Sequence, residues 1–152
     1  STSIADEFKR IYACRYYYDE THTATWPAQV VNYTAKTQYI FRINKQVLDV
    51  TDDADLNKFV PQTERPIPFE RMIYIADGLT DVPCMRLVKE YGGKSIAVYS
   101  NSDAVAKSLK DVGRVNYIAK ADYSSGSEME MIVQSILDHM KADEVLKKYE
   151  GK

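Results

Sequence analysis

The sequence has little of several residue types, and each shortage excludes a class of protein. Two cysteines, Cys14 and Cys84, in 152 residues are too few for a disulfide scaffold, so we expect two free thiols. Glycine and proline number 6 and 5, which excludes collagen-like and low-complexity chains. Neither sign of charge dominates, since 20 Lys and Arg residues face 22 Asp and Glu residues. The net charge of −2 excludes the electrostatic footprint of a nucleic-acid-binding protein.

Long hydrophobic runs are also missing. The longest plainly apolar run, 72–76, is far shorter than the roughly 20 residues that cross a bilayer. The first residues show no basic segment followed by an apolar one, so we expect a cytoplasmic protein that does not bind membranes. With 45% hydrophobic and 28% charged residues, the composition is that of a globular protein. The length is typical of one domain, which we expect to cover 1–152.

The C-terminal half alternates short strands with helices. Short apolar runs predict strands over 72–76, 95–99 and 115–119. Apolar stripes near helical spacing predict helices over 82–91 and 104–110. A longer helix follows Ser127, which forms a capping box with Glu130. This alternation is typical of an α/β fold, so we expect a Rossmann-like parallel sheet flanked by helices.

The first half has a different pattern. Residues 12–18 and 26–33 are extended and enclose a polar turn, which predicts a β-hairpin excursion at about 12–33. Apolar residues before it predict a short amphipathic helix at Ile4, Phe8 and Ile11. Two further helices are expected at 36–44, capped by Thr34, and at 52–60, capped by Thr51. Aromatic side chains of the hairpin are expected to pack rather than to bind a ligand; they are Tyr16, Tyr17, Tyr18 and Trp26.

Two carboxylates follow the first strand of the alternating half. Asp77 and Asp81 lie at the carboxyl end of strand 72–76, which is where open α/β sheets bind ligands. Two such charges about 5 Å apart repel by roughly 3 kcal/mol at an effective dielectric constant of about 20. A hard divalent cation such as Mg²⁺ would relieve that repulsion. The structural alternative is that Asp81 caps the next helix and Asp77 shapes the turn.

These residues belong to a segment that resembles a known motif. Ile73-Tyr74-Ile75-Ala76-Asp77-Gly78-Leu79-Thr80-Asp81 is similar to the last motif of the haloacid-dehalogenase-like (HAD) phosphohydrolases, G-D-G-x-x-D after a hydrophobic strand. Val82-Pro83-Cys84-Met85 and strand 95–99 resemble the phosphoserine-phosphatase-like branch. The resemblance implies a HAD-like fold, Mg²⁺ held by Asp77 and oriented by Asp81, and a small phosphorylated metabolite as substrate. Ala76 departs from the motif, which commonly has Gly, and its methyl group could crowd the turn.

The resemblance also implies an upstream lysine that holds the phosphoryl group. Lys36 matches best, because the start of helix 36–44 adds positive potential there; a solvated surface lysine is the alternative. The family nucleophile lies in an Asp-x-Asp motif behind a hydrophobic strand, which this sequence lacks. Asp53-Ala54-Asp55 has that spacing but lies in a polar helix start. We therefore expect the C-terminal part of a HAD-like phosphatase, incomplete at the N-terminal side of its sheet.

The missing strand has consequences for partners and activity. Strand 72–76 would expose an apolar edge, so we expect it to pair with a retained N-terminal fragment, a second copy of the chain or a rearranged 12–18 strand. The chain alone is expected to lack turnover, because covalent catalysis needs the nucleophile. Two alternatives remain: a non-catalytic binding module on the same fold, and a phosphotransferase or mutase. His22 and His139 lack ligand spacing, so we expect no metal site at either.

Overall fold

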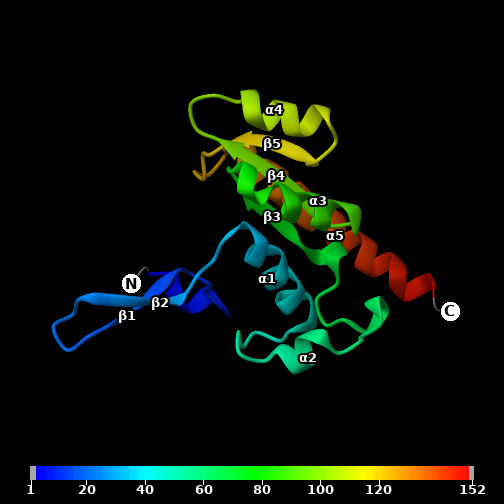
Figure 1. Cartoon of the computed structure of the whole chain (residues 1–152). Helices are drawn as coiled ribbons and strands as arrows, with labels where there is room; N and C mark the ends of the chain where they lie inside the picture. Colours follow the sequence, from blue (N-terminus) through cyan, green and yellow to red (C-terminus); the bar gives the residue numbers. More distant parts are fainter. Residues whose placement is uncertain (1–2, 151–152) are drawn as a thin grey trace. The chain divides into compact units, whose positions relative to one another are not determined.

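A computed structural model of the chain describes residues 3–150, which fall into two compact units divided between Phe59 and Val60 (Figure 1). Each unit is described by itself. The expectation that 1–152 forms one domain stays a prediction. None of the helices in the part of the chain that the structure describes is both long enough and apolar enough to cross a membrane.

The first unit contains a β-hairpin and two helices. Strands β1 (Arg15–Tyr18) and β2 (Ala24–Gln29) pair antiparallel, which confirms the predicted hairpin. Helices α1 (Tyr33–Lys45) and α2 (Asp53–Asn57) follow. Only one 3₁₀ turn, η1 (Ala5–Glu7), stands where the sequence predicts an amphipathic helix.

Both helices of the first unit begin at residues other than those predicted. The side-chain oxygen of Asn32 caps α1 by accepting a backbone N–H at 2.9 Å, and the Thr34 hydroxyl donates to that same oxygen at 2.8 Å. The carboxylate of Asp52 caps α2 in the same way at 3.0 Å. The predictions of Thr34 and Thr51 as caps are therefore wrong. Each threonine lies beside an amide or carboxylate oxygen that is at least as good an acceptor.

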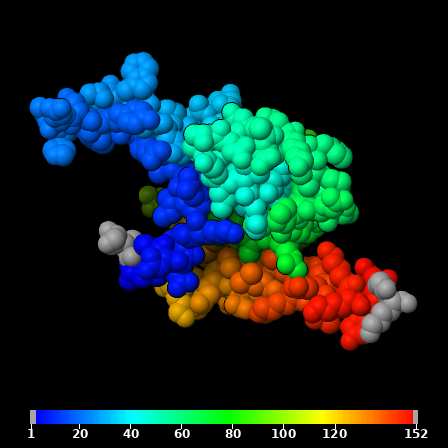
Figure 2. Space-filling view, turned by 90° about the horizontal axis from the view of Figure 1, so that it is seen from below, coloured from blue at the N-terminus to red at the C-terminus, as the bar shows by residue number. Residues whose placement is uncertain are grey.

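The hairpin forms an arm that extends beyond the rest of its own unit, drawn in blue in Figures 1 and 2. Its aromatic side chains are more than half exposed: Tyr16, Tyr17, Tyr18 and Trp26. The packing role predicted for them is wrong for the described residues, because a two-stranded ribbon has no second layer to bury either face.

The second unit is a parallel sheet with helices on both faces. Its strand order is β3 (Ile73–Ala76), β4 (Lys94–Tyr99), β5 (Tyr117–Lys120). Its helices are α3 (Val82–Glu90), α4 (Ala104–Asp111) and α5 (Glu128–Glu150). Short 3₁₀ turns η2 (Gln62–Glu64), η3 (Phe69–Arg71) and η4 (Leu79–Asp81) complete it. The predicted α/β class with a parallel, helix-flanked sheet is confirmed.

The two faces of this sheet bury separate clusters of apolar side chains. One cluster joins α3 and α4 to the sheet and includes Met85, Ala97 and Leu109. The other joins α5 to the opposite face and includes Ile96 and Ile136. Figure 1 shows the same arrangement, with α3 and α4 on one side of the strands and α5 on the other. Strand alternation thus produces the three layers.

The capping box of α5 is confirmed in part. The Ser127 hydroxyl accepts from the backbone N–H of Glu130 at 3.2 Å. The Glu130 carboxylate, however, accepts from the N–H of Gly126 at 2.5 Å rather than from that of Ser127. The Ser127 N–H instead donates to the carbonyl of Ser124 at 3.2 Å. The loop thus supplies the acceptor for the Ser127 N–H.

Candidate functional site

Asp77 and Asp81 both lie in the turn that joins β3 to α3. β3 ends at Ala76, so Asp77 is the first residue beyond the sheet, and η4 then leads to Asp81 at the N-cap position of α3. Pro83 lies in the first turn of α3, where its fixed φ favours the helix. Both acids therefore lie at the carboxyl edge of a parallel sheet, the edge where open α/β folds bind ligands.

Asp81 is buried and faces the sheet. Its side chain is 7% exposed and makes no capping hydrogen bond to α3. Its carboxylate oxygen Oδ1 instead accepts from the hydroxyl of Tyr74 at 2.6 Å. The alternative in which Asp81 serves as the helix cap is therefore not what the structure shows. Asp81 is a carboxylate held in place by a hydroxyl from the strand below it.

Tyr74 was not singled out by its position in the sequence. Burial raises the pKa of Tyr74 well above its usual range, and its hydrogen bond to Asp81 and the nearby Cys84 thiol raise it further. Cys84 itself is fully buried. The phenol thus stays protonated and donates to Asp81. The available signal in the sequence is a hydroxyl within an otherwise apolar strand.

Asp77 differs from Asp81 in its exposure and in its contacts. Its side chain is exposed, and its carboxylate makes no hydrogen bond or ion pair with any of residues 3–150. It lines a cavity of about 320 Å³ at the carboxyl ends of β3 and β4. The other lining residues are Leu79, Ala97, Val98, Tyr99, Ser100, Asn101, Ser102, Val105, Ala106 and Leu109. Asp77 is therefore available to bind a ligand from solvent.

The small residues of the turn leave room for these carboxylates. A methyl group on Gly78 would lie 3.2 Å from the oxygen Oδ2 of Asp81, which is a tight contact. Ala76, by contrast, packs against the cluster that contains Met85. The expectation that its methyl group could crowd the turn stays a prediction.

Lys36 lies in the first unit, in the opening turn of α1. Its backbone N–H donates to the carbonyl of Asn32 at 3.0 Å, which is the first hydrogen bond of the helix. The side chain is half-buried. The expected position at a helix start is confirmed, whereas the phosphoryl-binding role remains a prediction.

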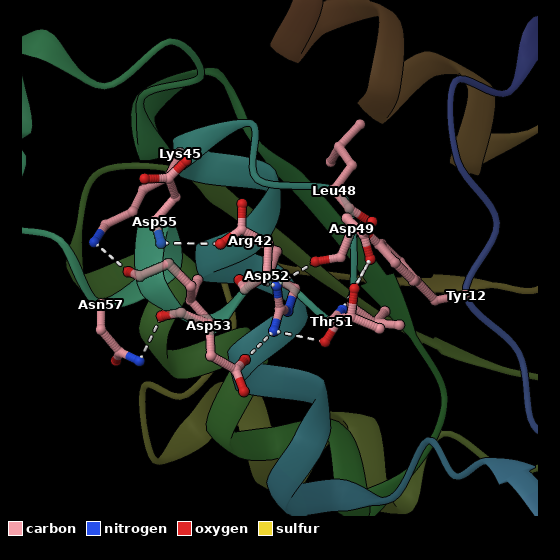
Figure 3. Close-up of polar contacts among 12 residues, drawn as sticks. Tyr12, Arg42, Lys45, Leu48, Asp49, Thr51, Asp52, Asp53, Asp55 and Asn57 are labelled. Carbon is pink, nitrogen blue, oxygen red and sulfur yellow. Dashed lines mark hydrogen bonds and ion pairs between the residues drawn. The ribbon is translucent and has the colours of Figure 1, made fainter.

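The Asp53-Ala54-Asp55 segment forms the start of α2. The Asp53 carboxylate pairs with the guanidinium of Arg42 at 2.6 Å (Figure 3). The Arg42 side chain is 1% exposed, whereas that of Asp53 is 69% exposed. This pair holds α1 and α2 together, so Asp53 has a structural partner, in keeping with its exclusion as a nucleophile.

The turn offers Mg²⁺ one accessible carboxylate. Mg²⁺ usually keeps several waters and is held by one or two carboxylates together with phosphate oxygens. Asp77 supplies one such carboxylate, exposed and unpaired within the described chain. Asp81 is buried with one oxygen bonded to Tyr74, and it is not among the residues that line the cavity beside Asp77. No group of three or more acidic, histidine or cysteine ligands occurs among residues 3–150. The Nε2 atom of His139 lies 3.4 Å from Oδ2 of Asp143, one turn further along α5 and away from this turn in the sequence.

Comparisons with known proteins gave one informative relative. A curated protein of Borreliella burgdorferi, described as an uncharacterized protein, is 35% identical over 102 residues, which are 65% of this chain and 34% of that protein. This chain thus spans about a third of the length of that relative. No family model matches the chain. No solved structure matches it.

Proposed function

We propose that the chain carries the metal-binding part of a Mg²⁺-dependent phosphatase of the HAD-like class. The observation that supports the proposal best is the pairing of two unlike carboxylates in one turn. Asp77 is exposed and unpaired within residues 3–150, beside a cavity, and Asp81 is buried and held by Tyr74. One acid can thus meet a ligand from solvent, while the other is held within the same turn by Tyr74. Segment 73–81 resembles the last HAD motif, and this resemblance gives the geometry a chemical interpretation.

Each residue has a distinct role in the proposal. Asp77 binds Mg²⁺ directly, and Asp81 orients the site from behind without leaving its bond to Tyr74. When bound, the cation would neutralise charge on the phosphoryl oxygens. Lys36 offsets the charge of the phosphoryl group and of the nucleophile. The nucleophilic aspartate comes from outside residues 1–152, so this chain alone turns over no substrate. The substrate is a small phosphorylated metabolite.

Metal binding can be tested on this chain without turnover. Mn²⁺ uses the same oxygen ligands as Mg²⁺ and broadens NMR signals of nearby amides. We expect Mn²⁺ to broaden the amide signals of residues 77–79 and Mg²⁺ to reverse this broadening by competition. Asp77→Asn should lower the affinity for Mn²⁺ at least tenfold. Asp111→Asn, an exposed acid at the end of α4, serves as the matched control and should change nothing. Broadening that persists in Asp77→Asn would contradict the metal site.

The catalytic part of the proposal is tested in a protein that contains both this chain and the nucleophile. Hydrolysis of p-nitrophenyl phosphate with Mg²⁺ should be lost in Asp77→Asn while the unfolding midpoint is unchanged. The second candidate is a non-catalytic binding module, which the lack of an Asp-x-Asp nucleophile behind a hydrophobic strand favours. If the chain is such a module, neither the parent protein nor its Asp77→Asn variant should show Mg²⁺-dependent hydrolysis. Transfer of phosphate to an alcohol rather than to water would indicate a phosphotransferase or mutase.

A further inference from the structure

The cavity beside Asp77 has one polar wall and one apolar wall. The polar wall is the loop after β4, where Ser100, Asn101 and Ser102 follow one another. The apolar wall includes Leu79, before α3, and Val105 on α4. A volume of about 320 Å³ is at the lower end of the range for small-molecule sites, so the occupant is small.

The polar wall has hydrogen-bonding groups to spare. Neither the Ser100 hydroxyl nor the Asn101 amide bonds to any other group among residues 3–150. The Ser102 hydroxyl accepts only a long bond of 3.4 Å from the N–H of Ala104. A hydroxyl and an amide both donate and accept, which suits them to the hydroxyl groups of a ligand.

Charge separates this cavity from a general anion site. Among the described lining residues, Asp77 is the one with a charged side chain, and it is negative. The acid that follows the polar wall, Asp103, is paired with Lys107 at 2.8 Å. A cation bound at Asp77 could serve one phosphate group, but the walls offer no positive charge to a second anionic group. An additional carboxylate on the ligand would therefore lie unpaired near Asp77.

We infer that this cavity binds the uncharged, hydroxyl-bearing part of a small phosphate monoester, with Ser100 and Asn101 recognising its hydroxyl groups. The inference rests on the proposed function and names its substrate class: phosphate monoesters of neutral polyols. Phosphate sits at the rim, beside Asp77. The rest of the molecule lies between the polar loop and the apolar wall.

A matched pair of ligands tests the inference on this chain by NMR. Glycerol 3-phosphate and 3-phosphoglycerate share a three-carbon skeleton, but the second replaces a hydroxymethyl group with a carboxylate. With Mg²⁺ present, glycerol 3-phosphate should shift the side-chain amide signal of Asn101, and 3-phosphoglycerate should bind at least tenfold more weakly. Inorganic phosphate, which lacks the polyol, should leave that amide signal in place. Equal affinity for the two esters, or an unshifted Asn101 signal, would overturn the inference.

Variants then separate this inference from the metal site. Asn101→Ala should lower the affinity for glycerol 3-phosphate about five- to tenfold while leaving that for inorganic phosphate unchanged. This is the loss expected for one hydrogen bond. Ser100→Ala should act in the same direction, and Ser108→Ala, an exposed serine of α4 outside the cavity, should not. If Mn²⁺ broadens the Asp77 turn but these variants change nothing, the cavity inference fails alone. If Mn²⁺ causes no broadening there, the proposed function fails as well.

Discussion

At the residue scale, the site depends on two carboxylates that the fold treats differently. Asp77 is exposed, whereas Asp81 is buried and accepts a hydrogen bond. Tyr74 supplies that donor from the strand below, at 2.6 Å. A buried carboxylate without a partner is costly, so Tyr74 stabilises both the fold and the geometry of the turn.

Tyr74→Phe should therefore destabilise the second unit by about 1.5–3 kcal/mol, because it removes the hydroxyl that donates to Oδ1 of Asp81, a hydrogen bond to a charged group. Urea unfolding followed by circular dichroism measures the change. Tyr91→Phe is the matched control, since Tyr91 is 44% exposed and packs against Phe69 through its ring, with centroids 5.0 Å apart. A Tyr74→Phe protein as stable as Tyr91→Phe would show that the hydrogen bond contributes nothing net.

The same tyrosine predicts a pH dependence. The pKa of Tyr74 is raised by burial and by Asp81, so above its usual value near 10 the folded chain keeps a proton that the unfolded chain releases. This contribution to stability is complete below about pH 10 and is lost as the pH rises further, by up to about 1.4 kcal/mol per pH unit. Between pH 9 and 11, the free energy of unfolding should decline less steeply in Tyr74→Phe than in the parent chain. Parallel curves for the two proteins would refute it.

At the element scale, one arginine holds the segment that joins α1 to α2. The Arg42 guanidinium is buried and donates to four oxygens at 2.5–3.1 Å (Figure 3). They are the carbonyls of Asp49, Val50 and Asp52 and the carboxylate of Asp53. Its Nε atom has no partner within residues 3–150. The sequence did not reveal this role, because an arginine in an amphipathic helix is usually solvated.

Arg42→Ala should destabilise the first unit by about 1–3 kcal/mol, because it leaves three backbone carbonyls without their donor, whereas water can solvate the Asp53 carboxylate, which is 69% exposed. Hydrogen exchange at the amides of α1 and α2 would report the loss locally. Arg86→Ala is the control: it removes an exposed pair with Glu90 on α3, which is worth about 0.5 kcal/mol or less. Similar exchange rates in the two variants would contradict a structural role for Arg42.

Helix starts show where reading the sequence succeeds and fails. The Ser127 cap of α5 was predictable, because Ser-x-x-Glu immediately precedes a long run of apolar residues at helical spacing. The caps of α1 and α2 were not predictable, because several neighbouring side chains can accept from the same backbone amide and only the backbone path decides among them. Asn32 and Asp52 lie two and one positions from the predicted Thr34 and Thr51 at the observed starts. Competing side chains thus limit what spacing can determine.

At the scale of the whole molecule, the alternation of strands and helices predicted the parallel sheet, because each buried strand reads as an apolar run. The position of Asp77 at a strand end followed from the same pattern. The cavity and the bond between Tyr74 and Asp81 did not, since they depend on how strands and loops distant in sequence lie in space. The hairpin was predictable, but the exposure of its aromatic side chains was not, because composition does not reveal a missing second layer.

Strand β3 lies at the edge of its sheet. Within the described residues β3 pairs only with β4, and β1 pairs with β2 in a separate sheet rather than with β3. An unpaired apolar strand edge is a template for another chain, so we expect this chain alone to associate through β3 as its concentration rises. A second copy of the chain would satisfy the edge.

Ile75→Lys tests that edge directly. Ile75 is 40% exposed on β3, and a charge there should block strand pairing, giving a monomer of 17.4 kDa by light scattering at concentrations where the parent chain associates. Val112→Lys is the control, because Val112 is 64% exposed at the end of α4, outside the sheet, and should leave association unchanged. A parent chain that stays monomeric at about 100 μM, and whose mass shows no co-purified fragment, would mean that β3 tolerates an open edge.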